Sequence, residues 1–329
     1  MRHGGDLTEA KKVFNHILID SWIDLSTGIN LNSYDSSGIS LSNLDTLPTK
    51  DSYDKLVAAA KNYYGVLNAN SLCISSGAQS LINILPYIFS IKKNVAIFSP
   101  TYSEHSISWK SANHSVREIN KIDQILNEDI IVITNPNNPD GLIYSHSDIE
   151  EIYSKIEKNN GLLIIDESFI DVTPELSFVK NLQNKNIIIL KSFGKFFGLA
   201  GLRIGFAIGN KDQIYNLENI LGPWPVSTVA LNIATKAISD IDWIKGTRSL
   251  LLKLSEELNS DLFSSGYNIN GSTAFFTLIS VKNAKKIQHE LANKGIWTRI
   301  FDYNSRWIRI GVPKDKETLE YLINTIRKI

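Results

Sequence analysis

Lys195 is the residue whose position most strongly suggests chemistry. It lies in the segment SFGKFFGLAGLR, Ser192 to Arg203, directly after the apolar run NKNIIILK. That run has the length and β-branched composition of a buried strand. The amine is therefore predicted just beyond the carboxyl end of a strand, where parallel sheets gather their ligand-binding groups. A lysine in such a place can form a Schiff base with a carbonyl compound.

Further polar residues follow other strand-like runs. In SSGAQS, three residues open a predicted helix, where free N–H groups and the helix dipole can hold an anion. The polar or anion-binding residues that follow strand-like runs are Gly77, Ala78 and Gln79 in SSGAQS, Asn138 in NPNNPDG, Asp166 in IIDES, and Ser192 and Arg203 beside Lys195. An amine, a carboxylate, a carboxamide and an anion-binding turn are thus expected at one edge of a sheet. This combination is the protein side of pyridoxal phosphate chemistry.

The composition excludes several other classes of function. The chain has 329 residues, 43% of them hydrophobic, and its 34 acidic and 34 basic residues balance to a net charge of zero. We therefore expect neither a nucleic acid nor an anionic membrane as a partner. A single cysteine, Cys73, allows no intrachain disulfide and suits a reducing cytoplasm. No secretory signal, membrane-spanning stretch or metal site is expected.

The order of apolar segments indicates the fold. From about residue 50, strand-like runs alternate with helix-length amphipathic segments. This pattern predicts an α/β fold with a mostly parallel central sheet flanked by helices. After LGPWPVSTVALNIATKAI, a long helical segment and short alternating runs predict a smaller α+β domain. We expect a large domain at residues 36–220, and an N-terminal arm plus small domain at 1–35 and 221–329.

Two of these motifs resemble a known family. SFGKFFGLAGLRIGF resembles the lysine motif of fold-type I pyridoxal-phosphate enzymes, the aspartate aminotransferase superfamily of class I and II, and NPNNPDG resembles its Asn-Pro loop. The resemblance implies pyridoxal 5'-phosphate as the cofactor and a homodimer with the site near the interface. It implies that Lys195 forms the Schiff base, Asp166 pairs with the pyridine nitrogen and Asn138 binds the 3-oxygen.

The same resemblance assigns the remaining site residues. The phosphate is expected to be held by Gly77, Ala78, Gln79, Ser192 and Arg203, and Tyr102 of SPTYSEHS is expected to stack on the ring. Arg309 in WIRIGVP is expected to bind the substrate carboxylate, which a guanidinium can do with two hydrogen bonds. Arg299 and Arg306 are alternatives for that role.

The sequence departs from the family pattern at two tyrosines. Phe169 in DESF stands where the family has a tyrosine that donates to the 3-oxygen, so the nitrogen joining lysine and cofactor is expected to keep its proton to higher pH. Leu47-Pro48 replaces the Tyr-Pro pair of the family. This leaves no tyrosine at that position for the second subunit's site.

Three further segments resemble one branch of the superfamily. HGGDL, WIDLSTGIN and LGPWPVS resemble the L-threonine-O-3-phosphate decarboxylases of cobalamin biosynthesis. The resemblance implies a phosphorylated amino-acid substrate, loss of its carboxylate to give (R)-1-aminopropan-2-yl phosphate, and substrate binding by His3 and Asn30. Leu31 replaces the proline that the branch has after this asparagine.

Other functions stay open at this point, because the lysine motif does not select which bond at the α-carbon breaks. A histidinol-phosphate aminotransferase, or a related aminotransferase, would share nearly all of these residues. Phe169, Leu47 and the HGGDL segment count against it. A pyridoxal-phosphate-binding regulator without catalysis is disfavoured, because no helix-turn-helix segment precedes the motifs.

Overall fold

The chain folds into two compact units. The computed structural model describes residues 4–18, 22–38, 45–67, 70–183 and 185–329. The larger unit comprises Ser33–Asn138 and Ile143–Lys245, and the smaller one comprises Met1–Asn32, Pro139–Leu142 and Gly246–Ile329. The helix α8 (Thr228–Ser239), which follows the boundary expected at residue 220, lies in the larger unit and packs against α2 (Lys50–Tyr64).

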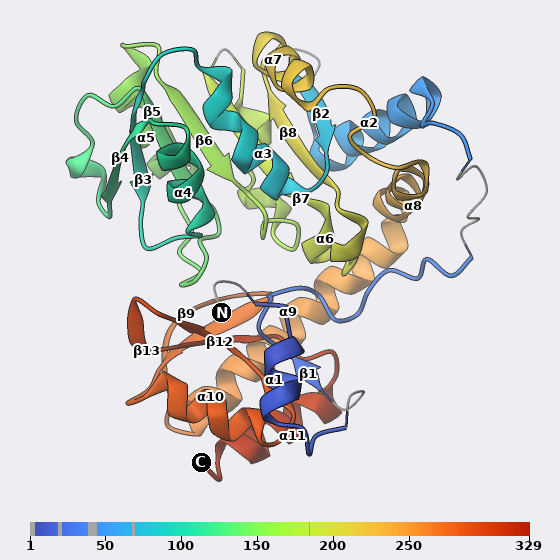
Figure 1. Ribbon diagram of the computed structural model, residues 1–329, viewed down its shortest axis with the longest axis vertical. Coiled ribbons are helices and arrows are strands. Elements are labelled where there is room, and N and C mark those ends of the chain that lie inside the picture. The colour runs from blue at the N-terminus through green and yellow to red at the C-terminus, as the bar shows by residue number, and fades with distance from the viewer. Residues whose placement is uncertain (1–3, 19–21, 39–44, 68–69, 184) are drawn as a thin grey trace. The chain divides into compact units, whose positions relative to one another are not determined.

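Seven strands form the central sheet of the larger unit (Figure 1). Their order is β2-β8-β7-β6-β5-β3-β4, and all neighbouring pairs are parallel except those that involve β8. The expected mostly parallel sheet flanked by helices is confirmed. The strands are β2 (Ser71–Ser75), β3 (Asn94–Phe98), β4 (Ser115–Ile119), β5 (Ile130–Thr134), β6 (Leu162–Asp166), β7 (Ile187–Ser192) and β8 (Gly205–Gly209).

Helices cover both faces of this sheet. On one face α3, α4 and α7 contribute to a single hydrophobic cluster with alternate residues of the strands. On the other face Tyr64 at the end of α2 packs edge-on against Phe206 of β8. The helices are α2 (Lys50–Tyr64), α3 (Ala78–Ile84), α4 (Glu104–Ser111), α5 (His146–Glu157), α6 (Phe193–Phe196), α7 (Lys211–Leu221), α8 (Thr228–Ser239) and the start of α9 (Ile241–Ser264). Short 3-10 turns are η2 (Leu85–Ile88), η3 (Ile122–Gln124), η4 (Pro174–Leu176), η5 (Phe178–Asn181) and η6 (Ala200–Leu202).

Local signals in the sequence fix the ends of these helices. The Thr49 side chain accepts a hydrogen bond from the backbone N–H of Ser52 and so caps α2. The same helix stops at Gly65, whose φ of +68° a residue with a side chain rarely adopts. Ser145 and Asp148 form a reciprocal capping box at the start of α5.

The smaller unit is built on a four-stranded antiparallel sheet. Its order is β12-β13-β10-β9, and a separate parallel pair joins β1 to β11. One face of the sheet packs on a hydrophobic cluster that includes Ile308 and Ile310, so the intervening Arg309 lies on the opposite face. The elements are α1 (Thr8–Val13), β1 (Ile23–Asp24), β9 (Asn268–Thr273), β10 (Phe276–Ser280), α10 (Ala284–Ala292), β11 (Ile296–Trp297), β12 (Arg299–Phe301), β13 (Asn304–Gly311), α11 (Lys316–Ile326) and the rest of α9.

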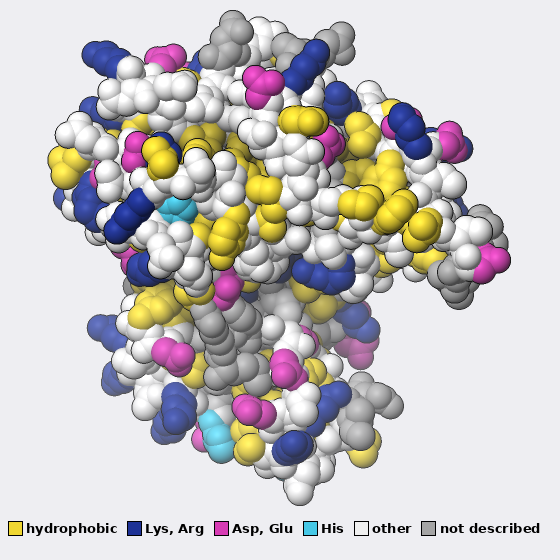
Figure 2. Space-filling view, turned by 45° about the horizontal axis from the view of Figure 1, so that its top comes forward, with side chains coloured by type: hydrophobic (Ala, Val, Ile, Leu, Met, Phe, Trp, Pro, Cys, Tyr) yellow, Lys and Arg dark blue, Asp and Glu magenta, His cyan; other side chains and the backbone are white. Residues whose placement is uncertain are grey.

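The surface carries charges of both signs. On the face shown in Figure 2, basic and acidic side chains are interspersed with exposed hydrophobic ones. Among the described residues, no helix has the length and apolar character that a membrane crossing requires.

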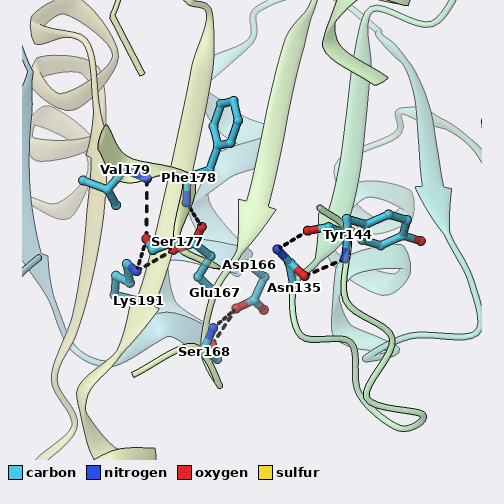
Figure 3. Close-up of polar contacts among 9 residues, drawn as sticks. All are labelled: Asn135, Tyr144, Asp166, Glu167, Ser168, Ser177, Phe178, Val179 and Lys191. Atoms are coloured by element: carbon cyan, nitrogen blue, oxygen red, sulfur yellow. Dashed lines mark hydrogen bonds and ion pairs between the residues drawn. The ribbon is translucent and has the colours of Figure 1, made fainter. Parts of the chain in front are cut away.

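A buried ion pair joins the ends of β6 and β7 (Figure 3). Lys191 Nζ lies 2.5 Å from Glu167 Oε2, and both side chains are at most 1% exposed. Ser177 Oγ lies 3.0 Å from Lys191 Nζ and donates to Glu167 Oε2 at 2.6 Å. The Phe178 backbone N–H donates to Glu167 Oε1 at 2.8 Å, and the Tyr64 ring centre lies 4.9 Å from Nζ. Both charges are therefore compensated, although the pair is removed from water.

Removing one charge of this pair should be costly. We expect Lys191→Met to lower the free energy of unfolding by about 3–5 kcal/mol, because Glu167 is left buried without a counter-charge. The double variant Lys191→Met/Glu167→Leu should lose less than the single one, since no charge remains buried. Urea denaturation measures both values.

An exposed ion pair provides the control. Lys50 and Asp54 form an i, i+4 pair with side chains 86% and 61% exposed. Lys50→Met should change the free energy of unfolding by at most about 0.5 kcal/mol. A double variant at 167 and 191 that is less stable than Lys191→Met alone would contradict this account of the pair.

Candidate active site

The predicted cofactor residues of the larger unit flank one edge of the central sheet. Asp166 and Ser192 are the last residues of β6 and β7. Because β8 runs antiparallel to its neighbours, its first residue, Gly205, lies at this same edge and pairs with both Ser192 and Ser75. Chain order alone does not reveal this neighbourhood, which results from the reversed direction of β8.

Lys195 follows β7 within the short helix α6. The helix is closely packed: a Cβ at Gly194 would lie 2.6 Å from the Cα of Ala200, so only glycine fits there. Lys195 itself is partly buried, with Nζ 5.4 Å from the centre of the Phe169 ring. The amine is thus held by a rigid turn and lies near an aromatic ring that carries no hydroxyl.

Asp166 is a buried carboxylate with two side-chain partners. His105 Nε2 lies 2.9 Å from its Oδ2. Ser168 donates to its Oδ1 from the backbone nitrogen at 3.0 Å and from Oγ at 2.5 Å (Figure 3). Burial raises the pKa of Asp166, but the hydrogen bonds and charge of His105, together with the Ser168 hydrogen bonds, outweigh it and hold this pKa below its ordinary value. The carboxylate is therefore ionised at neutral pH.

The start of α3 meets the start of β8 at very close range. A Cβ at Gly205 would lie 2.3 Å from the backbone nitrogen of Ala78, so a side chain at this position would push the strand and helix apart. Gly77 adopts a φ of +84°, which residues with a side chain rarely adopt, and a Cβ there would lie 2.7 Å from Nη2 of Arg203, so the guanidinium lies directly against this turn. Backbone amides and a guanidinium are thus brought together, which is a donor set suited to a phosphate group.

Tyr102 contacts the predicted residue Gln79 and also His105, which was not predicted. Its hydroxyl donates to Gln79 Oε1 at 2.8 Å, and its ring meets the His105 ring edge-on at 6.2 Å between centroids. Through His105 this chain of contacts reaches Asp166. The aromatic ring, the anion-binding turn and the carboxylate therefore belong to one cluster.

The loop that contains Asn138 is fixed by its neighbours. Asn137 accepts from Thr101 Oγ1 at 2.7 Å and donates to the Pro100 carbonyl at 2.9 Å. Asn135 exchanges two hydrogen bonds with the backbone of Tyr144 (Figure 3). These bonds hold the loop beside the segment that carries Tyr102, and Asn138 is partly buried within it.

Within the smaller unit, two arginines lie side by side. Arg299 of β12 and Arg309 of β13 are directly opposite in the antiparallel register. Arg309 is only 5% exposed, and its burial together with the charge of Arg299 lowers its pKa to about 10. Like charges directly opposite destabilise a sheet, so this arrangement favours an anion between or beside them. Arg306 lies two residues before Ile308 in β13, so its side chain is expected on the same face of the sheet as Ile308 and Ile310, opposite to the face of Arg309.

The remaining predicted residues belong to the N-terminal part of the chain. Asn30 is buried, and its side chain donates to the Asn32 carbonyl at 2.9 Å and accepts from the Asn32 backbone nitrogen at 2.9 Å. These bonds give it a part in shaping its own loop. Leu31, which replaces the expected proline, packs against the core of the smaller unit. His3 lies outside the described residues.

Sequence reasoning missed several residues of this region. His105 lies three residues after Tyr102, within SPTYSEHS, and Ser168 lies two residues after Asp166, within IIDES. A buried carboxylate needs hydrogen-bond partners, and this requirement was the available signal. No such signal pointed to the Glu167–Lys191 pair. Each residue is one of two consecutive polar residues at the end of an apolar strand, and the sequence does not indicate which distant residue it pairs with.

Comparisons with known proteins identify the family of the chain. The sequence model of the family "Aminotransferase class I and II" matches residues 40–326. A threonine-phosphate decarboxylase of Sinorhizobium sp. is 35% identical over 315 residues, which cover 95% of this chain and 93% of that protein. A threonine-phosphate decarboxylase of Pseudomonas aeruginosa is 34% identical over 319 residues, covering 96% and 94%.

Solved structures share the fold. The histidinol-phosphate aminotransferase of Sinorhizobium meliloti, solved in complex with pyridoxal-5'-phosphate, has a TM-score of 0.74 at 21% identity and covers 85% of this chain and 83% of its own. The family resemblance expected from the lysine motif is confirmed. The chain belongs to the class I and II aminotransferase family.

Proposed function

We propose that the protein is a pyridoxal-phosphate-dependent decarboxylase that converts L-threonine O-3-phosphate to (R)-1-aminopropan-2-yl phosphate. The observation that carries this proposal is the similarity to two threonine-phosphate decarboxylases at 34–35% identity over at least 95% of the chain. The cross-strand arginine pair agrees with it, since this substrate carries both a carboxylate and a phosphate.

The residues at the sheet edge fit pyridoxal phosphate. Glycines at 77 and 205 let the start of α3 lie directly against β8 and Arg203, so that backbone amides and a guanidinium together offer donors to a phosphate. Asp166 is ionised and can hold a proton on the pyridine nitrogen. Lys195 supplies the amine for covalent attachment.

Each predicted cofactor residue then has a role within the larger unit. We assign phosphate binding to Gly77, Ala78, Gln79, Ser192 and Arg203. Tyr102 would stack on the ring, and Asn138 would donate to the 3-oxygen. Lys195 and Asp166 would act on the reacting system itself.

The substrate's charges are assigned to the smaller unit. Arg309 would bind the carboxylate with its planar guanidinium, and Arg299, opposite it, would supply a positive charge for the substrate's phosphate. Because the pKa of Arg309 is lowered only to about 10, the guanidinium stays charged at neutral pH. His3 and Asn30 are proposed as further substrate contacts.

The choice of bond follows from orientation. When bound, pyridoxal phosphate accepts the electron pair of the bond that breaks at the α-carbon. Of the bonds at the α-carbon, the one perpendicular to the ring plane overlaps with the π system of the ring and is the one that breaks. Arg309 would hold the carboxylate so that the bond to carbon dioxide takes this orientation, Asp166 would keep the ring nitrogen protonated, and Lys195 would be the point of attachment for the cofactor.

The biological setting is part of the proposal. The product would serve as the linker of the nucleotide loop in cobalamin biosynthesis. A cytoplasmic location agrees with the buried free thiol of Cys73, whose pKa burial raises to about 12. A homodimer agrees with exposed hydrophobic side chains of the larger unit such as Leu47 (62%), Tyr215 (64%) and Trp224 (53%).

Decarboxylation can be tested without an amino-group acceptor. The protein loaded with pyridoxal phosphate should release carbon dioxide from threonine phosphate when no keto acid is present. Lys195→Ala should abolish turnover, because the attachment point is lost. Carbon dioxide and keto product are measured in the same reaction.

The runner-up function gives a different result in this assay. A histidinol-phosphate aminotransferase would need 2-oxoglutarate or a similar acceptor and would return a keto product. Turnover of histidinol phosphate with an acceptor, without release of carbon dioxide from threonine phosphate, would overturn the proposal.

The environment of Asp166 predicts a dependence of stability on pH. Its lowered pKa stabilises the folded state above about pH 4, and this contribution is lost as the pH falls through the folded-state pKa. We expect His105→Phe to lower the free energy of unfolding by about 1.5–3 kcal/mol at pH 7. The difference from the wild type should shrink below about pH 4. Urea denaturation of the cofactor-free protein across this range measures it.

A second variant checks the cause. Ser168→Ala removes the hydroxyl bond to Asp166, leaves the backbone bond in place, and should show the same pH dependence to a smaller extent. A loss of stability in His105→Phe that stays constant from pH 7 to pH 3 would show that packing, rather than the carboxylate, is responsible.

Phe169 predicts the protonation behaviour of the lysine–cofactor linkage. Its ring centre lies 5.4 Å from Lys195 Nζ and carries no hydroxyl. Phe169→Tyr should lower, by about one unit or more, the pKa of the nitrogen that joins Lys195 to the cofactor, because a phenol stabilises the deprotonated form by hydrogen bonding. Titration of the visible absorbance measures this pKa, and Phe263→Tyr, at a site 74% exposed, is the control. An unchanged titration in Phe169→Tyr would contradict the prediction.

A further inference from the structure

Ser26 contacts both the N-terminal segment and Arg309. Its side chain is fully buried in the smaller unit. The backbone N–H of Gly5 donates to Ser26 Oγ at 2.9 Å, and Arg309 Nη2 donates to the Ser26 carbonyl at 2.7 Å. Two parts of the chain that lie near opposite ends of the sequence therefore bind the same residue.

Ser26 is itself held in place. Asp24 Oδ1 accepts from the Ser26 backbone nitrogen at 2.9 Å and from its hydroxyl at 2.6 Å. The preceding residue, Leu25, donates to the Trp297 carbonyl at 2.8 Å and accepts from the Gly311 nitrogen at 2.7 Å. The Ser26 carbonyl therefore cannot move far without breaking bonds to two neighbouring strands.

Gly4 lies directly on this serine. A Cβ at position 4 would be 2.5 Å from the Ser26 carbonyl oxygen and 2.8 Å from its hydroxyl, so any side chain there requires the backbone to shift. Gly5 adopts a φ of +91°, which residues with a side chain rarely adopt. The glycine pair of the HGGDL segment is thus explained by its fit to Ser26.

The N-terminal segment is also anchored beyond the glycines. Ala10 and Phe14 are buried in a small cluster with Ala292, and Trp22 and Trp297 pack against it. The segment is therefore held both at Gly5 and at Phe14. A side chain added at Gly4 cannot be accommodated by moving the whole segment away, so the strain falls on Ser26.

The other partner, Arg309, is oriented from two sides. One N–H is directed at the Ser26 carbonyl, and the guanidinium carbon lies 4.7 Å from the centre of the Phe276 ring. A planar guanidinium with one edge and one face fixed presents its remaining donors in a defined direction.

We propose that Ser26 is a positioning residue for substrate binding: it fixes the N-terminal segment and Arg309 relative to one another, and so sets the direction in which Arg309 meets a carboxylate. This inference rests on the proposed function, which gives Arg309 the carboxylate of the substrate. Ser26 acts through Arg309 and does not itself react.

Two ligands that differ by the carboxylate test this role. Threonine phosphate contains it, and 1-aminopropan-2-yl phosphate does not. Gly4→Ala should weaken binding of threonine phosphate by about tenfold or more to the protein loaded with pyridoxal phosphate, and binding of 1-aminopropan-2-yl phosphate by less than about twofold. Ser26→Ala loses the hydroxyl's bonds to Gly5 and Asp24 but keeps the carbonyl and the backbone bond to Asp24, and it should shift binding in the same sense. Dissociation constants are read from the change in cofactor absorbance on adding each ligand.

A glycine elsewhere in the smaller unit serves as the control. A Cβ added at Gly246 in α9 would meet no atom within 4 Å, so Gly246→Ala should bind both ligands as the wild type does. The affinity for pyridoxal phosphate should be unchanged in every variant. If Gly4→Ala does not take up the cofactor, Ser26→Ala decides the matter.

The outcomes separate this inference from the proposed function. Unchanged binding of threonine phosphate in both variants, or equal weakening of both ligands, overturns the role of Ser26. Because binding is measured rather than carbon dioxide, a wild type that binds threonine phosphate without decarboxylating it contradicts the proposed function and leaves this comparison valid.

Discussion

The site depends on the alternation of side chains at the ends of β6 and β7. Consecutive residues of a strand point to opposite faces of the sheet. The end of each of these strands has two consecutive polar residues, Asp166 and Glu167 at β6 and Lys191 and Ser192 at β7. Asp166 is directed toward the α4 face, where it meets His105, whereas Glu167 is directed toward the α2 face, where it meets Lys191 near Tyr64. The ion pair on one face thus connects the two strands whose opposite-facing residues form the site.

Much of the fold and of the cofactor region could be predicted from the sequence. Continuous apolar runs of β-branched residues, separated by amphipathic segments, are typical of a parallel sheet with two covered faces. Once that sheet is predicted, residues at strand ends such as Asp166 and Lys195 must share an edge. This step needs only chain order and the direction of the strands, which is why local motifs were sufficient.

The parts that could not be predicted depend on contacts between distant segments. The reversed direction of β8 brings Gly205 against Ala78, and no local pattern indicates such a pairing. The contacts of Ser26 with Gly5 and Arg309 likewise join residues 21 and 283 positions apart. Sequence periodicity reports which face of an element is buried, but it does not report which other segment covers that face.

The division of labour between the two units bears on how such chains diverge. The residues assigned to the cofactor belong to the larger unit, whereas Arg299, Arg309 and Ser26 belong to the smaller one. On the proposed assignments, mutations that alter ligand preference can accumulate in one unit while the residues for the chemistry in the other are preserved. Such a separation would allow a chain to acquire a new substrate while it keeps the residues that hold its coenzyme.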